Sequence, residues 1–254
     1  MKFDKYLPTE HLRPYIKCFV VSENDLESEY KVFPSSGLVI GFQYKGQLSS
    51  LKGDKIDKLK SSGITGISDS YKIFKNSADI GTVLVYFTET GFSHFASNPV
   101  NELFNLSLSL DNVLDKRMVS EVEEKLASAT SDKQRIKIVE QFFISQLKDI
   151  QTDKLISEAV RLIYQSKGNI RIKELNEKLF ISQSPFEKRF RKVVGTTPKK
   201  FASIIRFNSI LNGLSESKSL IEICYEYNFF DQAHFIKDFK QFTGDTPENF
   251  KRFL

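Results

Sequence analysis

One stretch of sequence occurs twice in this chain, and this repeat constrains the fold more than any other feature. The first copy is SQSPFEKRFRKVVGTTPKKF at residues 182–201, and the second is DQAHFIKDFKQFTGDTPENF at residues 231–250. The copies are offset by 49 residues and share a Gln, a Lys, a Gly, a Thr, a Pro and three Phe at equivalent positions. Self-similarity at a fixed offset indicates that one structural unit is built twice.

Each copy predicts a helix with one apolar face. Two phenylalanines lie four residues apart in each copy, which places them on the same side of a helix. They are Phe186 and Phe190 in the first copy, and Phe235 and Phe239 in the second. The opposite face carries Ser184, Glu187, Lys188 and Arg191 in the first copy, and Gln232, Ala233, Lys237 and Lys240 in the second.

The end of each helix is also encoded twice. Gly195 and Gly244 predict helix stops, because a left-handed residue costs least at glycine. A Thr-Pro pair follows each glycine after one residue, at 197–198 and 246–247. Thr is a favourable N-cap and Pro suits the first helical position, so a new helix is expected there.

A further helix is expected before each copy, at residues 172–179 and 220–227. Ser219 and Glu222 form a capping-box pattern for the second of these. Ser182 and Asp231 are candidate N-caps of the helices that follow. A short helix, a tight turn and a second helix with polar outer positions form the helix-turn-helix pattern, in which the second helix is the recognition helix. A plain helical bundle explains the buried Phe, but not the matching turns or the polar outer faces.

Residues 152–254 resemble the DNA-binding domain of the AraC/XylS family of transcriptional regulators. The residues that carry the resemblance are Leu175, Ser182, Phe186, Phe190, Gly195, Thr197, Pro198, Arg206, Ile223, Phe229, Asp231, Phe235, Phe239, Lys240, Gly244, Thr246 and Pro247. The family usually has Ala where this chain has Asn176 and Cys224, and Gly in each turn where it has Phe180 and Asn228. Because Phe does not adopt left-handed backbone easily, the first turn is expected to have a different shape.

The resemblance implies double-stranded DNA as the partner, contacted in the major groove at two half-sites, with RNA polymerase as a further partner. Base contacts are then expected from Ser184, Glu187 and Lys188 in the first unit, and from Gln232, Ala233, His234 and Lys237 in the second. Arg191 and Lys240 are expected to contact phosphates, which fix the register. A small-molecule effector and a homodimer are further expectations, while the effector, the operator and the sign of regulation stay open.

Charge is distributed unevenly along the chain. Residues 152–254 hold 18 Lys and Arg against 12 Asp and Glu, whereas residues 1–151 hold 19 against 20. The excess positive charge therefore lies in the part that contains the repeat, as expected for a domain that meets phosphates. A well-solvated basic surface would give the same count.

The amino-terminal part predicts a β-rich domain. Strands are expected within residues 16–21, 30–33, 38–44, 63–74, 81–88 and 105–110, with a Lys-rich solvated loop or hairpin at 49–62. Short strands separated by Gly, Pro, Ser and Asn suggest a small barrel or sandwich, cupin-like in type. Candidate pocket residues are Tyr44, Tyr71, Tyr86 and His94.

Two amphipathic helices are expected next, at residues 115–129 and 133–149. They could form a dimer interface or pack against the β domain. We therefore predict an α+β protein with three parts: a sensor or assembly domain at 1–114, a helical linker at 115–151 and an all-α DNA-binding domain at 152–254. The last part contains two helix-turn-helix units, at about 172–195 and 220–244, joined by a long helix from about Pro198 to Gly213.

No pattern in the sequence supports catalysis, a cofactor or a metal site. The three histidines, His11, His94 and His234, are isolated, and Cys18 and Cys224 are expected to be buried as small hydrophobes. No apolar run is long enough to span a membrane, no signal peptide is evident, and a cytoplasmic location is expected. The alternative hypothesis is a ligand-binding module whose helical part binds a protein partner and not DNA.

Overall fold

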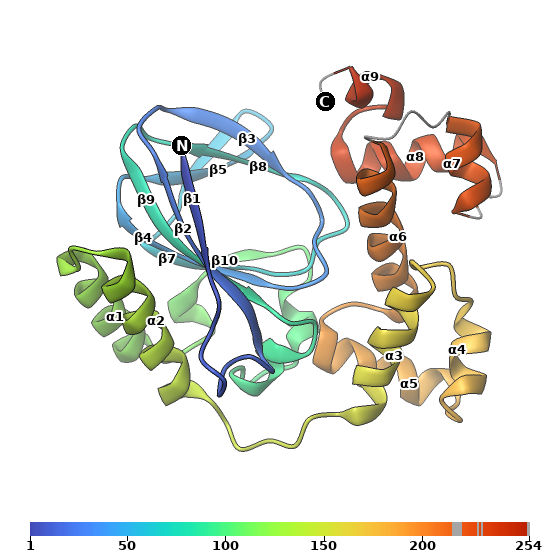
Figure 1. Cartoon of the computed structure of the whole chain (residues 1–254), viewed down its shortest axis with the longest axis horizontal. Coiled ribbons are helices and arrows are strands. Elements are labelled where there is room, and N and C mark those ends of the chain that lie inside the picture. Colours follow the sequence, from blue (N-terminus) through green and yellow to red (C-terminus); the bar gives the residue numbers. More distant parts are fainter. Residues whose placement is uncertain (215–219, 228, 230, 253–254) are drawn as a thin grey trace.

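The computed structural model describes residues 1–214, 220–227, 229 and 231–252. The amino-terminal half contains two antiparallel sheets, and the carboxy-terminal part is helical (Figure 1). Neither sheet closes on itself, so the β-rich domain is confirmed as two open sheets and not as a closed barrel. No helix in the described ranges combines the length and apolarity needed to cross a bilayer.

The larger sheet has six strands in the order β1-β2-β9-β4-β7-β10. Their bounds are β1 Lys2–Tyr6, β2 Ile16–Asn24, β4 Val39–Lys45, β7 Ser62–Thr65, β9 Ile80–Phe87 and β10 Ser107–Ser109. The smaller sheet has four strands in the order β3-β8-β5-β6. They are β3 Ser28–Val32, β5 Leu48–Lys52, β6 Lys55–Lys58 and β8 Lys72–Asn76. The Lys-rich segment therefore forms a hairpin.

Two features of this domain differ from expectation. Strand β1 was not expected, because its charged sequence KFDKY has no alternation of apolar and polar residues. The strand is mostly exposed and pairs with β2 at the edge of the larger sheet. Residues 63–74 were expected as one strand but cross from β7 in one sheet to β8 in the other. At Gly66, directly after β7, an added Cβ would lie 1.9 Å from the Leu103 carbonyl oxygen, so only glycine fits there.

The two linker helices, α1 (Lys116–Ser128) and α2 (Asp132–Gln146), pack against the larger sheet, on the side away from the carboxy-terminal helices (Figure 1). Phe143 of α2 is fully buried and its ring lies 5.4 Å from those of both Phe87 and Phe95. The Phe142 ring lies 5.9 Å from that of Phe42 on β4. The apolar stripe of α2 is therefore covered by the β domain.

Between β9 and α1 lie three short 3-10 turns, η1 (Gly91–His94), η2 (Val100–Leu103) and η3 (Leu110–Asn112).

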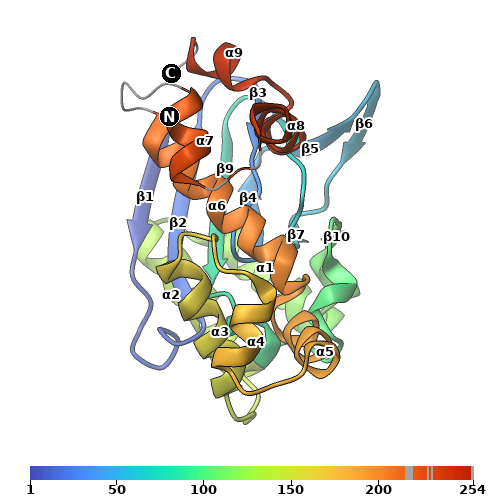
Figure 2. The same ribbon diagram turned by 90° about the vertical axis from the view of Figure 1, so that its right-hand side faces the viewer.

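The carboxy-terminal helices form two groups joined by α6 (Pro198–Leu214) (Figure 2). The first group contains α3 (Lys154–Gln165), α4 (Ile172–Lys178) and α5 (Gln183–Val194). The second contains α7 (Leu220–Glu226), α8 (Gln232–Thr243) and α9 (Pro247–Lys251). The order of helices and the positions of their ends confirm the reading of the repeat as two helix-turn-helix units.

Substitution Phe143→Ala is expected to lower the free energy of unfolding by about 3–5 kcal/mol, because it opens a cavity where the rings of Phe42, Phe87 and Phe95 meet α2. Urea denaturation measures this. The adjacent Ile144 is 48% exposed, so Ile144→Ala serves as the control and should change the value by less than about 0.5 kcal/mol. Equal effects of the two substitutions would contradict the packing described for α2.

Candidate nucleic-acid interface

The first helix-turn-helix unit buries its phenylalanines and exposes its polar face. Phe186 and Phe190 of α5 are fully buried, with ring centroids 5.7 Å apart, and the Phe190 ring lies 5.6 Å from that of Phe201 on α6. On the opposite face Ser184, Lys188 and Arg191 are exposed and Glu187 is half-buried. Glu187 Oε1 accepts a hydrogen bond from Gln183 Nε2 at 2.9 Å. Ser182 occupies the N-cap position of α5, but its side chain makes no capping hydrogen bond.

The turn of the first unit contains a left-handed phenylalanine. Phe180 has a φ of +50° and is 97% exposed. The Ile181 N–H donates to the Asn176 carbonyl oxygen at 3.1 Å. The expectation of a different turn shape is therefore wrong, since Phe180 takes the left-handed conformation that glycine would adopt. The half-buried flanking residues Leu179 and Ile181 pack on the core, and this packing offsets the backbone strain. Asn228 in the second turn lies outside the described residues, as does Ser219.

The second unit repeats this arrangement. Phe235 and Phe239 of α8 are buried with ring centroids 5.8 Å apart. Asp231 caps the helix, since its Oδ1 accepts from the His234 N–H at 2.7 Å. The five predicted contact residues of this helix are all exposed: Gln232, Ala233, His234, Lys237 and Lys240.

The helix stops have the conformation that the sequence predicts. Gly195 and Gly244 have φ values of +99° and +81°, and their N–H groups donate to Arg191 and Lys240 carbonyl oxygens. Thr246 Oγ1 then accepts from the Asn249 N–H at 3.3 Å to cap α9. In the first unit Thr197 Oγ1 accepts from the Lys200 N–H at 3.2 Å and caps α6. The two recognition helices, α5 and α8, therefore end in equivalent turns.

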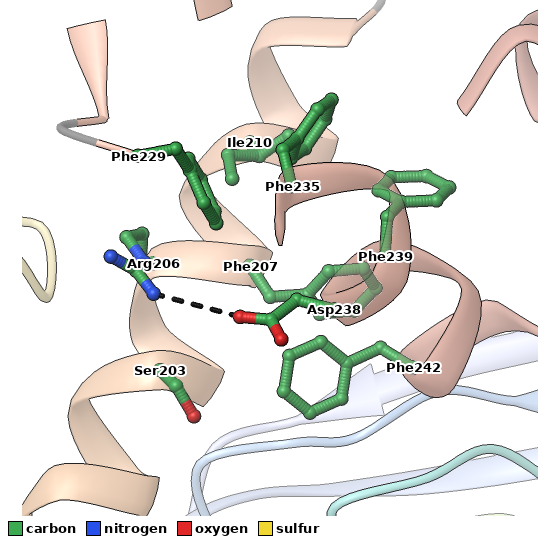
Figure 3. Close-up of a pocket in the computed structure, with 9 residues that line it drawn as sticks. All are labelled: Ser203, Arg206, Phe207, Ile210, Phe229, Phe235, Asp238, Phe239 and Phe242. Atoms are coloured by element: carbon green, nitrogen blue, oxygen red, sulfur yellow. Dashed lines mark ion pairs between the residues drawn. The ribbon is translucent and has the colours of Figure 1, made fainter. Parts of the chain in front are cut away.

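Arg206 of α6 connects the long helix to α8 (Figure 3). Its guanidinium lies 3.8 Å from the Asp238 carboxylate and stacks 4.2 Å from the Phe229 ring. Asp238 in turn lies 3.5 Å from Nε2 of His234 on the exposed face. Burial lowers the pKa of Arg206, and Asp238 acts in the opposite direction. Sequence reasoning missed Asp238, although its spacing of four residues from His234 was a usable signal.

The hollow beneath Arg206 is not an effector site. It has a volume of about 10 Å³ and is lined mainly by phenylalanines, among them Phe207, Phe235 and Phe242. A volume of this size holds at most about one water molecule.

The exposed face of α5 borders the amino-terminal domain. Gln183, Ser184, Glu187, Lys188 and Arg191 line an open groove together with Asn101 of η2. The structure thus brings the predicted residues of the first unit together on one surface. It also adds Asn101, which no sequence pattern indicated.

The candidate pocket residues of the β domain have separate surroundings. Tyr44 donates to Glu23 Oε1 at 2.7 Å and lies under Arg135. Tyr71 lies at the boundary with α8, against Gly244. Tyr86 lies on β9 opposite Cys18 of β2. His94 is buried against Tyr15, with ring centroids 4.6 Å apart, and burial lowers its pKa.

The residue types that commonly bind metals do not form a metal cluster within the described residues. No group of three His, Cys, Asp or Glu side chains is positioned to hold a metal ion in this part of the chain. Cys18 and Cys224 are both buried free thiols, as expected from an apolar strand for Cys18 and a core-facing side of a helix for Cys224.

Two family models match the chain. Residues 175–252 match a model described as "Helix-turn-helix domain", and residues 4–109 match one described as "Domain of unknown function (DUF6597)". The two matched ranges coincide with the helical part after α3 and with the two sheets.

Two curated proteins are similar in sequence. The Msm operon regulatory protein of Streptococcus mutans is 26% identical over 147 residues, which cover 56% of this chain and 50% of that protein. An uncharacterized HTH-type transcriptional regulator of Haemophilus influenzae is 25% identical over 116 residues, which cover 45% and 38%. The matches therefore span half or less of the length of these relatives.

Solved structures of similar arrangement are distant in sequence. ToxT from Vibrio cholerae O395, solved bound to (E)-4-(8-methylnaphthalen-1-yl)but-3-enoic acid, is 13% identical with a TM-score of 0.48, covering 99% of each chain. The AraC-like transcriptional activator CuxR is 13% identical with a TM-score of 0.34, covering 89% of this chain and 84% of its own.

Substitution Phe180→Gly is expected to raise the free energy of unfolding by about 1 kcal/mol, because glycine adopts a positive φ without the penalty that a Cβ imposes. Chemical denaturation measures the change. Phe180→Ala is the matched control, since it also removes the exposed ring but keeps the Cβ, and it should give no such gain. A gain with alanine as large as that with glycine would assign the effect to the ring and not to the backbone.

Substitution Arg206→Met is expected to destabilise the protein by about 1–3 kcal/mol, because it leaves the half-buried Asp238 carboxylate without its cationic partner. The control is Arg161→Met, which breaks an ion pair whose Arg161 side chain is 52% exposed, with an expected change below about 0.5 kcal/mol. Thermal and urea unfolding compare the two variants. A loss no larger than that of the control would show that Arg206 does not secure α8.

Proposed function

Residues 175–252 of this chain form a helix-turn-helix domain of the AraC type, and from this premise we propose that the protein is a sequence-specific, DNA-binding regulator of transcription. The observation that carries the proposal is the equivalence of the two units. Each buries a Phe pair and presents an exposed polar recognition helix that ends in the same glycine turn. A bundle without a partner has no need for two matching exposed faces.

The connecting helix supports a tandem DNA reader. Helix α6 runs from Pro198 to Leu214, and its 17 residues span about 25 Å at 1.5 Å per residue. Successive major grooves on one face of DNA lie about 34 Å apart. Allowing for the width of the helices at either end, α6 suits the placing of α5 and α8 in adjacent grooves.

Side-chain chemistry assigns different roles to the exposed residues. In α5 we assign base contacts to Ser184, Glu187 and Lys188. In α8 we assign them to Gln232, Ala233, His234 and Lys237. Gln can pair with adenine, Lys with guanine, and an Ala methyl with the thymine methyl. Arg191 and Lys240 occupy the later turns of their helices and are assigned to phosphates, where they would fix the register without reading sequence.

The proposal also assigns a role to each part of the chain. We assign residues 1–114 to a sensor or assembly domain, 115–151 to a helical linker and 152–254 to DNA binding, with a small effector acting on the first part. Because the apolar stripe of α2 is packed on the sheet, a homodimer would use other surfaces. RNA polymerase is the proposed partner at the promoter, and no enzymatic activity is proposed.

A protein-binding role for the helical part is the second candidate function. It predicts weak DNA binding without base preference, whereas a DNA reader shows a base preference together with a steep loss of affinity as salt rises. Selection of bound sequences from a randomised duplex pool, with the full chain at near-physiological salt, distinguishes the two. The DNA-reader proposal expects an asymmetric site with two short elements about one helical turn apart. The absence of any enriched sequence would contradict it.

Substitution Lys237→Ala is expected to weaken binding to the selected site by about 1–3 kcal/mol and to relax the preference at one base pair. Lys240→Ala is the matched comparison on the same helix, with a more uniform loss across sequences and a salt slope reduced by about 1. Titrations on the selected site and its single-base variants, at several salt concentrations, measure both effects. If the loss for Lys237→Ala were equal on every sequence, its assignment to the groove would be wrong.

A further inference from the structure

One loop of the amino-terminal domain touches both helix-turn-helix units. The loop connects β7 to β8 and contains Asp69 and Tyr71. Its contacts fall near the glycine turns that end the two recognition helices. A single loop of the other domain therefore contacts the start of α6 after the first turn and the end of α8 beside the second turn.

The contact beside the first unit is an ion pair with the start of α6. Asp69 Oδ2 lies 3.0 Å from Nζ of Lys200, which follows the Gly195 turn near the start of α6. Both side chains are largely shielded, with exposed fractions of 21% for Asp69 and 34% for Lys200. Shielding from solvent strengthens an ion pair relative to one on the open surface. Val100 of η2 packs beside this point, 3.0 Å from the position of a Cβ on Gly195.

Contact with the second unit uses the same loop. The carbonyl oxygen of Asp69 accepts a hydrogen bond from Nε2 of Gln241, near the end of α8, at 3.1 Å. The Tyr71 ring covers Gly244 so closely that an added Cβ would lie 2.7 Å from it. Lys31 of β3 reinforces this contact through an ion pair of 2.6 Å with Asp245.

The loop is held in shape by its own domain. The Asp69 N–H donates to Asn105 Oδ1, and Asn105 Nδ2 donates to Asp69 Oδ1, both at 3.0 Å. Asn105 has a φ of +62°, a conformation that costs free energy in a residue other than glycine. Asn105 of the β domain thus fixes Asp69, while the other carboxylate oxygen and the carbonyl oxygen of Asp69 contact Lys200 and Gln241.

We propose that Asp69 is a positioning residue that fixes the separation of the two recognition helices and thereby the spacing of the two half-sites on DNA. Helix α6 connects the two units, and an ion pair of 3.8 Å joins Lys167, before α4, to Glu226 of α7. Small bends at the ends of α6 would still change the distance between α5 and α8. The Asp69 loop adds a connection through the amino-terminal domain, from the start of α6 to the end of α8. This inference rests on the proposed function, because it concerns how the same DNA contacts are arranged.

The test uses the full chain and a panel of duplexes in which the two selected elements are moved apart or together by one and two base pairs. Each base pair changes their separation by about 3.4 Å along the axis. The wild type is expected to lose about 10-fold or more in affinity for each wrong spacing. Asp69→Ala is expected to reduce this discrimination to about 3-fold or less. Lys200→Met removes the other partner of the ion pair and should act in the same direction.

Matched controls separate positioning from charge. Asp57→Ala removes a carboxylate from the exposed strand β6, and Lys199→Met removes an exposed ammonium beside Lys200. Both should keep the spacing preference of the wild type, with thermal unfolding of all variants recorded to verify folding. An unchanged spacing profile for Asp69→Ala and Lys200→Met would overturn the proposal. So would an equal gain in affinity at every spacing, which would make the loop a general restraint on DNA binding. Absence of any sequence preference in the wild type would instead overturn the proposed function itself.

Discussion

The burial of two phenylalanines four residues apart is the interaction on which each helix-turn-helix unit depends. Phe186 and Phe190 fix one face of α5 in the core, and Phe235 and Phe239 do the same for α8. Once these rings are buried, the rotation of each helix about its axis is set, and the residues on the opposite side have to face outward. The exposed polar residues follow from this packing. The proposed DNA interface is thus a consequence of hydrophobic burial on the other side of the same helices.

The second level of organisation is a set of polar contacts between elements. Arg206 joins α6 to α8 through Asp238 within the helical part, and the Asp69 loop joins the β domain to α6 and α8. These contacts are polar and partly exposed, so each is weaker than the burial of a Phe pair. Such contacts suit adjustment by a ligand or partner, whereas the cores of the individual units do not.

The sequence predicted the helical part closely because its signals are local. Glycine stops, Thr-Pro starts and i, i+4 Phe pairs act within a few residues, and the structure has each of them where expected. Signals that depend on tertiary contact were missed. The role of Asp69 depends on Lys200 and Gln241, which are far along the chain. Phe180 is a second example. Local backbone preferences disfavour a left-handed conformation at Phe, but the packing of the neighbouring Leu179 and Ile181 on the core holds Phe180 in it.

The measurement that tests the central claim most directly is hydroxyl-radical footprinting of the full chain on its selected DNA site. Two recognition helices held on one side of the molecule should protect two short segments on the same face of the duplex, with centres about one helical turn apart. Protection of a single segment, with the second element cleaved as in free DNA, would contradict the account of two equivalent units acting together.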